Sequence, residues 1–393
     1  MPKHHVVVVG GGFAGTKAAL SLAGDDRFKV TLISDHDDFR YYPSLYRTAT
    51  GGRRYISSVP LKEIFRGKST KLLIDSVTKL DRAKKTISLK SIPPLAYDSL
   101  VLALGVQTNY FNIKGLKEFS YGIKTIDEAE RFKKHLHEQI ISQKHLDLNY
   151  IIIGGGPTGV ELAGVLPAYL KAIARQHGLK RPAVRVSLVE AAPRLLPRLP
   201  KDIGTAVARH LRQLKVKLYL DTLVLAENAE TLTLGDKKMF SQTVVWTAGV
   251  SNHPFFSDNG FQINKNGKVR VDQYLQAEKD IYVIGDNADT AYSGMAQTAL
   301  NDGRYIAYSL KTSASNDLPD PYKAKKPIYV MPAGHKWAAV LWGKLRFYGR
   351  FGFALRRAAD LVAYHDYEPW QLATKRWIAE DDSEEECAIC GRI

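Results

Sequence analysis

Cysteine is almost absent from the sequence. Its 393 residues include only two cysteines, Cys387 and Cys390, which follow an acidic run near the C-terminus. Two thiols cannot form a disulfide framework or a four-cysteine zinc site within one chain, and this usage fits a reducing compartment. Their Cys-x-x-Cys spacing invites a redox interpretation, but the pair lacks the strand-to-helix context of thioredoxin-like sites. We interpret both residues as incidental thiols.

Long apolar runs are also missing. Nowhere do about 18 consecutive apolar residues occur, so no membrane-spanning helix is expected. The N-terminus lacks the basic head, apolar stretch and cleavage site of a signal peptide. Any contact with a membrane is therefore expected to be peripheral. The composition, 45% hydrophobic and 24% charged, is otherwise that of a globular protein with two or three domains.

Acidic residues are in deficit. Lys and Arg number 56 against 40 Asp and Glu, which leaves a formal net charge of +16. Such an excess favours a polyanionic partner, and nucleic acid, anionic lipid and phosphorylated cofactors are the candidates. Basic and aromatic residues alternate near the C-terminus, but no nucleic-acid-binding motif accompanies them, so we predict no nucleic-acid partner.

A glycine-rich turn follows the first apolar run. Val6 to Val9 are typical of a strand buried on both faces, and they lead into Gly10-x-Gly12-x-x-Gly15 and a helical pattern. The first glycine permits the tight turn, the second lets backbone approach a pyrophosphate, and the third lets helix pack on strand. The helix N-terminus then faces the phosphates. The pattern predicts a dinucleotide-binding unit.

The same unit occurs a second time. Tyr150 to Ile153 lead into Gly154-x-Gly156-x-x-Gly159 and a further helical pattern. One such match is weak evidence, because a buried strand and a glycine turn produce it alone, but two complete units indicate two doubly wound domains. The pair predicts two bound dinucleotides, a flavin and a nicotinamide.

An acidic residue is expected where the second strand of each unit ends, since it would bind a ribose hydroxyl. In the second unit that residue is Glu190, which favours NADH because its carboxylate repels a 2′-phosphate. Arg194 is a nearby guanidinium that could instead accept the phosphate. In the first unit the strand ends in Ser34, followed by Asp35. Serine can still hydrogen-bond a ribose, and a solvated strand end is the alternative for either acid.

Small residues close three further apolar strands. Ala103 and Gly105 follow one, Ala248 and Gly249 follow another, and Gly285-Asp286 follows the third. Bulky side chains at these positions would collide with a dinucleotide passing the strand ends. The aspartate stands where open α/β sheets bind ligands, although Gly-Asp is more often a plain turn.

Together these segments resemble the two-dinucleotide flavoprotein disulfide-reductase superfamily and, within it, the type II NADH dehydrogenases, over most of residues 5 to 310. The most telling segments are His5 to Gly15 with Phe13-Ala14-Gly15, Tyr42 to Tyr46 followed by Thr48 to Gly52, Gly154 to Gly164 with Glu161, Val245 to Val250, and Gly285-Asp286 before Ala296-Gln297-Thr298-Ala299. The resemblance implies FAD on the first motif, NADH on the second, and two electrons passing from NADH through the flavin to a quinone. It also implies flavin contacts from Phe13, Ala14, Tyr42, Thr48 and Ala296.

The expected fold is α/β, with two Rossmann-like dinucleotide-binding domains and a helical, amphipathic C-terminal region. The resemblance implies a discontinuous FAD domain, residues 1–119 and 270–325, interrupted by an NADH domain, residues 120–269. Residues 326–393 form the expected membrane-association or dimerisation region with an acidic tail.

The quinone site departs from the family pattern. Members usually carry Ala-Gln-x-Ala-x-Gln beside the flavin, whereas this chain has Asn301 in place of the last glutamine. The resemblance makes Gln297 our candidate for the quinone head group and Glu161 the candidate that orients the acceptor or relays protons. A plain amphipathic helix is the alternative for the segment from position 296, and a first-turn acid that complements the helix dipole is the alternative for Glu161.

The C-terminal region mixes bases with aromatics. From Lys336 to Trp377 eight Lys or Arg residues face three acids. Family members typically anchor to the membrane surface here, and apolar residues recur near helical spacing, which favours an interfacial helix on anionic lipid. These apolar residues are Trp337, Leu341, Leu345, Tyr348, Leu355 and Val362. The alternative is a helix packed on its own protein or on a second subunit of a homodimer. We therefore predict a peripheral protein at the cytoplasmic face of the cell membrane.

Two other functions stay open. The chain lacks a cysteine before position 387, which argues against disulfide and sulfide:quinone reductases, because both need thiols beside the flavin. A soluble NAD(P)H-dependent flavoprotein reductase of a small acidic redox protein would suit the basic surface. An NADH-sensing flavoprotein that turns over slowly is the other alternative.

Overall fold

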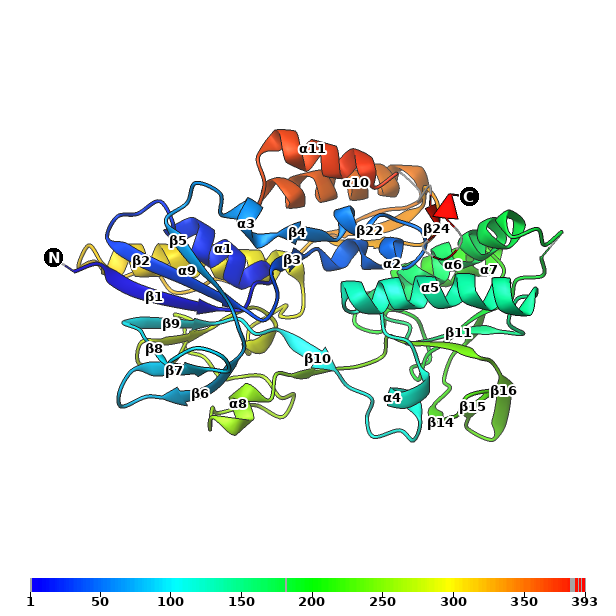
Figure 1. Cartoon of the computed structure of the whole chain (residues 1–393), viewed down its shortest axis with the longest axis horizontal. Coiled ribbons are helices and arrows are strands. Elements are labelled where there is room, and N and C mark those ends of the chain that lie inside the picture. Colours follow the sequence, from blue (N-terminus) through cyan, green and yellow to red (C-terminus); the bar gives the residue numbers. More distant parts are fainter. Residues whose placement is uncertain (1, 181, 382–385, 388, 390, 393) are drawn as a thin grey trace.

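The computed structural model describes residues 2–180, 182–381, 386–387, 389 and 391–392. Cys390 lies outside the described residues. Two α/β halves lie side by side, and the C-terminal helices cross the top of the view (Figure 1). Within the described ranges, no helix has the length and apolar character needed to cross a bilayer.

A six-stranded sheet forms the first half. Its strand order is β19-β20-β9-β1-β2-β5, and all neighbours pair in parallel except β19 with β20. The valines of β1 are fully or almost fully buried because the strand lies inside the sheet between β2 and β9. The strands are β1 (His4–Val9), β2 (Phe28–Ser34), β5 (Thr70–Ile74), β9 (Ser99–Leu102), β19 (Gln276–Glu278) and β20 (Ile281–Val283).

Helices cover one face of this sheet and a β-meander covers the other. On the helical face α1 (Phe13–Leu22) packs against α9 (Ala296–Ser313). The opposite face packs on the meander through Leu80, Ile87 and Leu89. Its strands are β6 (Val77–Asp81), β7 (Thr86–Leu89) and β8 (Leu95–Ala96), and shorter elements at this half are β3 (Asp38–Arg40), β4 (Ser58–Pro60), α3 (Leu61–Ile64), α8 (Phe255–Asp258) and the 3₁₀ turn η3 (Gly285–Asn287).

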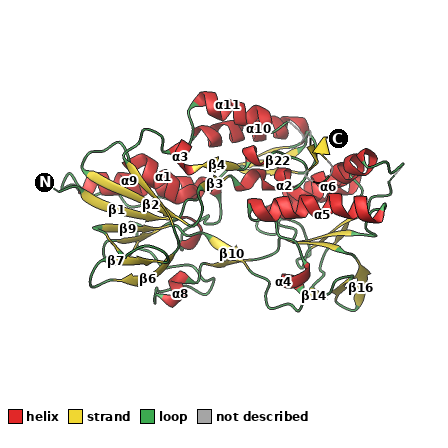
Figure 2. Ribbon diagram, in the orientation of Figure 1, coloured by secondary structure: helices red, strands yellow, loops and turns green. Residues whose placement is uncertain are grey.

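The second half repeats this plan. Its four parallel strands have the order β13-β12-β11-β17, with helices on one face and an antiparallel meander on the other (Figure 2). The strands are β11 (Tyr150–Ile153), β12 (Val186–Val189), β13 (Val216–Tyr219) and β17 (Thr243–Trp246). The helices are α5 (Ile126–Gln143), α6 (Pro157–Gln176) and α7 (Lys201–Gln213), with the short α4 (Leu116–Phe119), and the meander is β14 (Val224–Glu227), β15 (Thr231–Leu234) and β16 (Lys237–Phe240).

A narrow ribbon joins the halves where the chain passes between them. β10 (Val106–Thr108) runs out of the first half and β18 (Val250–Asn252) returns, and the two pair antiparallel. Asn287 secures one end of this ribbon, because its Nδ2 donates to Oδ1 of Asn252 at 2.5 Å.

The C-terminal region begins as a sheet. β21 (Tyr329–Pro332), β22 (Ala338–Trp342) and β23 (Leu345–Phe347) form an antiparallel sheet, followed by α10 (Gly349–His365), α11 (Trp370–Ala379) and the hairpin β24 (Glu386–Cys387) with β25 (Gly391–Arg392). The helical interpretation of the apolar spacing from Trp337 to Leu345 was therefore wrong, because alternation along a strand and a glycine turn produced that spacing. The helix expected around Leu355 and Val362 is confirmed.

Candidate functional site

The first glycine motif forms a cradle at the start of α1. Gly10 has φ +112°, and a Cβ added to it would lie 2.1 Å from the carbonyl oxygen of Ala103. A Cβ on Gly15 would lie 2.0 Å from the Gly10 carbonyl oxygen, whereas a Cβ on Gly12 would meet nothing within 4 Å. Gly12 is also the N-cap of α1 and offers no side-chain cap. Gly10 and Gly15 therefore pack too tightly for any side chain, whereas Gly12, at the start of α1, leaves room for a ligand.

The second motif has the same geometry. Gly154 has φ +114°, and its Cβ would lie 2.8 Å from Cα of Ala248. A Cβ on Gly159 would lie 1.9 Å from the Gly154 carbonyl oxygen, while one on Gly156 would meet nothing within 4 Å. Gly156 is the uncapped N-cap of α6. Both cradles thus fit a pyrophosphate whose anionic oxygens meet free backbone N–H groups.

Glu190 lies just beyond β12, beside the second cradle. Its two carboxylate oxygens accept from the backbone N–H groups of Gly155 at 2.6 Å and Ala192 at 2.7 Å, and the side chain stays half-buried. The Arg194 guanidinium donates to the carbonyl oxygens of Leu196, Pro197 and Leu199. Arg194 is therefore held by its own loop, which leaves Glu190 as the charged group beside the glycine turn.

At the first cradle Ser34 is buried and Asp35 is exposed. A Cβ on Gly11 would lie 2.5 Å from Oγ of Ser34, so the serine hydroxyl lies directly beside the glycine turn. Asp35 contacts Nδ1 of His36 at 2.8 Å, and this neighbour holds the pKa of the carboxyl below its usual value, although desolvation by the surrounding protein acts in the opposite sense. Ser34 is the last residue of β2 and Asp35 follows it, and the binding of a ribose by either residue stays a prediction.

Two of the three strand ends that carry small residues, those at Ala103 and Gly285, lie beside α1. Gly285 has φ +68°, and its Cβ would lie 3.1 Å from Cβ of Ala14. Asp286 is half-buried, and burial raises the pKa of its carboxyl although Lys268 and Lys124 oppose the rise. Gly249 lies differently, because its Cβ would collide with the Phe111 ring at 2.5 Å.

Two residues that the sequence analysis missed hold this edge together. Asn287 accepts from the N–H of Gly105 at 2.8 Å and donates to its carbonyl oxygen at 2.6 Å. Asp302 is fully buried, and its carboxylate accepts from the N–H of Gly285 at 2.9 Å and from the Tyr322 hydroxyl at 2.5 Å. Asn287 directly follows Gly285-Asp286, so its position was an available signal; nothing in the sequence marked Asp302.

Aromatic side chains flank the first cradle. Phe13 is buried and stacks on Tyr42, with ring centroids 6.4 Å apart and an interplanar angle of 27°. Tyr42 is 43% exposed and offers a ring to a flat ligand. Thr48 is fully buried and its hydroxyl pairs with Oγ of Ser57 at 2.6 Å, so its side chain faces the protein interior.

Glu161 lies in the second turn of α6. The first turn of that helix holds no acid, so the alternative interpretation as a first-turn dipole partner was wrong. Burial raises the pKa of Glu161 to about 8, with Asp360 acting in the same direction and Arg356 and Arg47 against it. A carboxyl with such a pKa holds a proton near neutral pH and can release it.

Gln297 stands in the first turn of α9, next to the half-buried Ala296. Its side-chain amide makes two hydrogen bonds to the backbone of one residue. Nε2 donates to the carbonyl oxygen of Ile328 at 3.0 Å, and Oε1 accepts from the Ile328 N–H at 2.9 Å. Asn301 turns its amide to the Tyr322 hydroxyl at 3.4 Å. Gln297 thus ties α9 to the strand that opens the C-terminal region.

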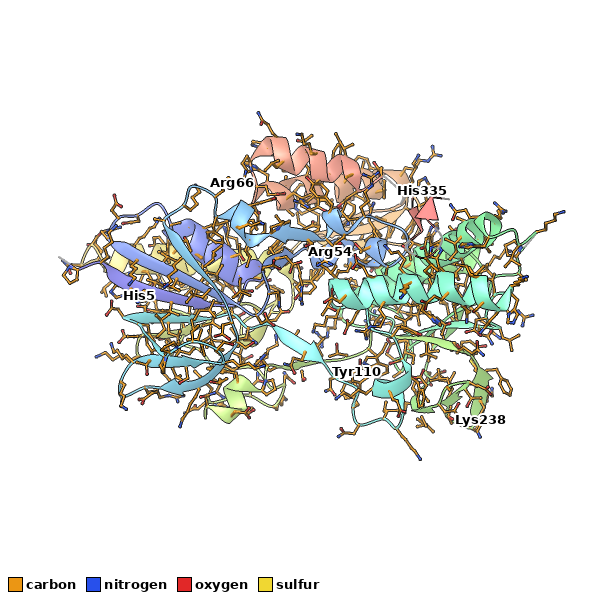
Figure 3. All side chains as sticks on the ribbon, in the orientation of Figure 1. His5, Arg54, Arg66, Tyr110, Lys238 and His335 are labelled. Atoms are coloured by element: carbon orange, nitrogen blue, oxygen red, sulfur yellow. The ribbon has the colours of Figure 1, made fainter. Side chains whose placement is uncertain are left out.

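A buried ionic cluster joins the C-terminal helices to the segment around Tyr42, and the sequence analysis did not predict it. On the helices its members are Arg356, Arg357, Asp360, Tyr364, Glu368, Arg376 and Glu380; on the other side are Tyr41 and Ser44 around η1 (Tyr42–Ser44), Arg47 in α2 (Leu45–Thr48), and η2 (Arg54–Ile56). Glu380 accepts from Ser44 and Tyr364, and Arg376 pairs with Glu368 at 2.8 Å. In Figure 3 Arg54 marks η2 below the C-terminal helices.

The family model for pyridine nucleotide-disulphide oxidoreductases matches residues 4–303. A type II NADH:quinone oxidoreductase of Mycobacterium tuberculosis, NdhA, is 29% identical over 95% of this chain and 86% of that protein. One from Staphylococcus haemolyticus is 27% identical over 78% and 81%.

Among solved structures, NDH2 of Plasmodium falciparum in complex with NADH superimposes with a TM-score of 0.84, at 18% identity, over 96% of this chain and 98% of that one. This likeness shows that the two chains share a fold. The α/β expectation with two Rossmann-like units is confirmed by the sheets and by this match. Helices on both faces of each sheet, which a doubly wound domain has, are not found in the described part of the chain, because a β-meander covers one face. With two open glycine cradles on paired parallel sheets and a family model spanning both, the chain belongs to the pyridine nucleotide-disulphide oxidoreductase family.

Proposed function

We propose that this chain oxidises NADH and passes two electrons through FAD to a quinone. The observation that carries the proposal is the pair of cradles, each with one glycine open to a ligand, in a chain whose curated relatives are type II NADH:quinone oxidoreductases. FAD would bind at the first cradle, in residues 1–119 and 270–325, and NADH at the second, in residues 120–269. Bound FAD supplies the hydride-accepting and electron-passing chemistry.

The nicotinamide preference follows from two side chains. Glu190 places a carboxylate where an adenosine ribose meets the second cradle, and a 2′-phosphate there would be repelled. The Arg194 guanidinium donates three hydrogen bonds to backbone carbonyl oxygens of its own loop, and these bonds hold it away from the role of phosphate ligand. These contacts favour NADH over NADPH.

The acceptor follows from what flanks the first cradle. No cysteine precedes position 387, so the chain lacks the thiols that disulfide and sulfide chemistry needs. Tyr42 would cover the flavin ring, and Glu161 would hold a proton for the acceptor. Gln297 uses one of its two Nε2 hydrogens and its Oε1 on Ile328, so its second N–H would be the donor to a quinone carbonyl.

The C-terminal region supports a surface role. α10 buries Arg356, Arg357 and Asp360, whereas Phe351 and Val362 on the same helix are 60% and 56% exposed. A surface helix of a globular protein usually buries its apolar side chains and exposes its charged ones, and α10 does the opposite. The exposed apolar side chains of α10 therefore favour a second surface, from a membrane or another protein, that covers them. Exposed large apolar residues on the neighbouring elements are Trp342, Leu345, Trp370 and Ile378, and exposed bases among them are Lys344, Arg350 and Lys375.

A basic, apolar surface of this kind suits an anionic membrane surface, where a quinone also resides. We therefore propose peripheral binding at the cytoplasmic face of the cell membrane. A second copy of the chain over the same face is the competing arrangement, and the mass of the protein in detergent-free solution distinguishes it.

The function is tested by anaerobic stopped-flow on the FAD-loaded protein. NADH should bleach the flavin absorbance, and a short-chain quinone added next should restore it rapidly. Bleaching without recovery would refute quinone reduction, and rapid recovery with an iron-sulfur protein would then favour the soluble reductase. A long-lived complex of nicotinamide with reduced flavin, without an acceptor, would instead favour a sensing role.

A further inference from the structure

A single buried amide bonds both strands of the ribbon that joins the two halves. Asn287 is fully inaccessible to solvent. Its Oδ1 accepts from the N–H of Gly105 at 2.8 Å, and its Nδ2 donates to the Gly105 carbonyl oxygen at 2.6 Å. Gly105 directly precedes β10, where the chain leaves the first half. The orientation of the amide is fixed, because a backbone N–H can only donate and a carbonyl oxygen can only accept.

The second strand of the ribbon meets the same amide. Nδ2 of Asn287 also donates to Oδ1 of Asn252 at 2.5 Å, and Asn252 ends β18, opposite Val106. Asn252 is held in turn, since its Oδ1 accepts from the His253 N–H at 2.9 Å and its Nδ2 donates to the Gly267 carbonyl oxygen at 2.7 Å. The outgoing and the returning strand are therefore bonded to one side chain where they meet the first half.

The same residue belongs to the edge of the first half where FAD is proposed to bind. Asn287 ends the 3₁₀ turn η3, directly after Gly285 and Asp286. A Cβ on Gly285 would lie 3.1 Å from Cβ of Ala14, in the helix that starts at the first cradle. The backbone carbonyl oxygen of Asn287 accepts from the Val269 N–H at 2.9 Å, so its peptide unit is held as well as its side chain. Asn287 therefore connects the proposed flavin edge directly to the ribbon.

Hydride transfer places a strict demand on this connection. The reacting atoms of two bound cofactors must approach to about 3–3.5 Å, and a displacement of about 1 Å can cost about a hundredfold in rate. With FAD at the first cradle and NADH at the second, the relative placement of the halves sets that distance. The ribbon has three residue pairs, and a two-stranded ribbon has little stability of its own. Its direction therefore depends on how its end is anchored in the first half.

We propose that Asn287 is a positioning residue for hydride transfer, which aligns the NADH-binding half with the flavin by anchoring both strands of the ribbon at the flavin edge. This inference rests on the proposed function, and specifically on its first step, in which a hydride, one proton with two electrons, leaves NADH and is accepted by FAD. Asn287 acts through Gly105 and Asn252 and takes no part in the bond changes.

The first measurement is the rate at which NADH bleaches the flavin absorbance of the FAD-loaded protein, in anaerobic stopped-flow over a range of NADH concentrations. In Asn287→Ala the limiting rate at saturating NADH should fall about tenfold, as a shift of about half an ångström would produce. The NADH concentration at half-saturation should change less than about twofold, because the second cradle is untouched. A merely destabilised protein would instead bleach with a smaller amplitude at the wild-type rate.

A second readout follows the chain itself, without turnover. Asn287→Ala leaves the Gly105 N–H without its acceptor, so hydrogen–deuterium exchange at one amide of a peptide spanning residues 103–109 should quicken about tenfold or more, with and without FAD. Asn252→Ala removes one bond of the Asn287 amide and keeps the Gly105 pair, so it should lower the limiting bleaching rate by a smaller factor. The double variant should lose less than the product of the two single losses, because both act through one hydrogen bond.

Gln139→Ala is the matched control. Gln139 is also a buried amide, 3% exposed, and its Oε1 accepts from the Tyr150 hydroxyl at 2.8 Å while its Nε2 donates to Oγ1 of Thr243 at 3.4 Å. Tyr150 and Thr243 begin β11 and β17, whereas the second cradle follows the end of β11. Loss of this amide should lower stability but leave the limiting bleaching rate and the exchange of residues 103–109 unchanged.

The outcomes separate this inference from the proposed function. A wild-type flavin that NADH does not bleach overturns the proposed function, and the positioning role with it. If NADH bleaches the wild type, an unchanged limiting rate or unchanged Gly105 exchange in Asn287→Ala overturns the positioning role alone, and so does an equal slowing in Gln139→Ala. Should Asn287→Ala fail to fold, Asn252→Ala decides, and a wild-type limiting rate in that variant overturns the inference.

Discussion

The two kinds of glycine in the first motif should respond oppositely to alanine. Gly10 has φ +112° and its Cβ would lie 2.1 Å from the carbonyl oxygen of Ala103, just after β9, whereas a Cβ on Gly12 would meet no atom within 4 Å. In Gly10→Ala, the left-handed backbone costs about 1–2 kcal/mol. Moving the end of β9 away from the new methyl adds about 1–3 kcal/mol. We expect a loss of about 2–5 kcal/mol in unfolding free energy, a large share of a normal domain's stability.

Gly12→Ala should leave stability within about 1 kcal/mol of the wild type, because its Cβ meets no protein atom and a small helix-cap loss offsets the entropy gain. The same methyl enters the space beside the helix N-terminus that a pyrophosphate would occupy. We therefore expect FAD affinity to fall at least tenfold, which is about 1.4 kcal/mol.

The assay pairs urea unfolding of the apoprotein with titration of FAD into the folded protein. Gly154→Ala and Gly156→Ala are the matched pair in the second motif, with NADH as the ligand and the same expected division of effects. If Gly12→Ala binds FAD as the wild type does, or loses as much stability as Gly10→Ala, then the open glycine is not a cofactor contact and the cradle argument fails.

Three further outcomes test separate parts of the molecule. Glu190→Gln should weaken NADH binding about tenfold in a fluorescence titration; equal affinity of the wild type for NADH and NADPH would contradict the assigned role. Phe351→Asp should release the protein from sedimenting vesicles that contain anionic lipid while turnover of a water-soluble quinone stays unchanged, and undiminished sedimentation would count against the membrane proposal. Arg376→Ala leaves Glu368 buried without its 2.8 Å partner and should destabilise the protein by about 3–5 kcal/mol in urea, so a loss below about 1 kcal/mol would show that the pair is not a buried ion pair in solution.

The glycine units were predictable because the same spacing occurs twice, each time between an apolar run and a helical pattern. Gly10 and Gly154 need positive φ and close strand contact, and the flanking apolar runs identify the strands. The strand ends at Ala103 and Gly285 followed from the same reasoning. These features depend on neighbours along the chain, which a single sequence displays.

The ionic cluster was not predictable for the opposite reason. Arg356 and Asp360 look like solvated charges on a helix, yet they contact Pro43 and Tyr41, more than 300 positions away, and are buried. The spacing from Trp337 to Leu345 misled in a related way, since short apolar runs satisfy a strand and a helix equally until their partners are known. Where long-range packing decides burial, a periodic pattern predicts little.

The C-terminal region touches both halves of the molecule. α10 and α11 bind the segment from Tyr41 to Ser58 through the ionic cluster, while the sheet that precedes them packs on the second half, where a Cβ on Gly164 would lie 2.3 Å from the N of Gly334. Figure 1 shows this bridge on the side opposite the β10 ribbon.

The β10–β18 ribbon and the C-terminal region join the two halves on opposite sides, so neither connection can act as a hinge while the other is intact. The two halves should therefore keep one relative orientation throughout turnover, so that nicotinamide binding triggers no closure. Electron delivery in such an enzyme would respond little to solvent viscosity, and cutting the C-terminal bridge would set the second half free to turn about the three residue pairs of the ribbon.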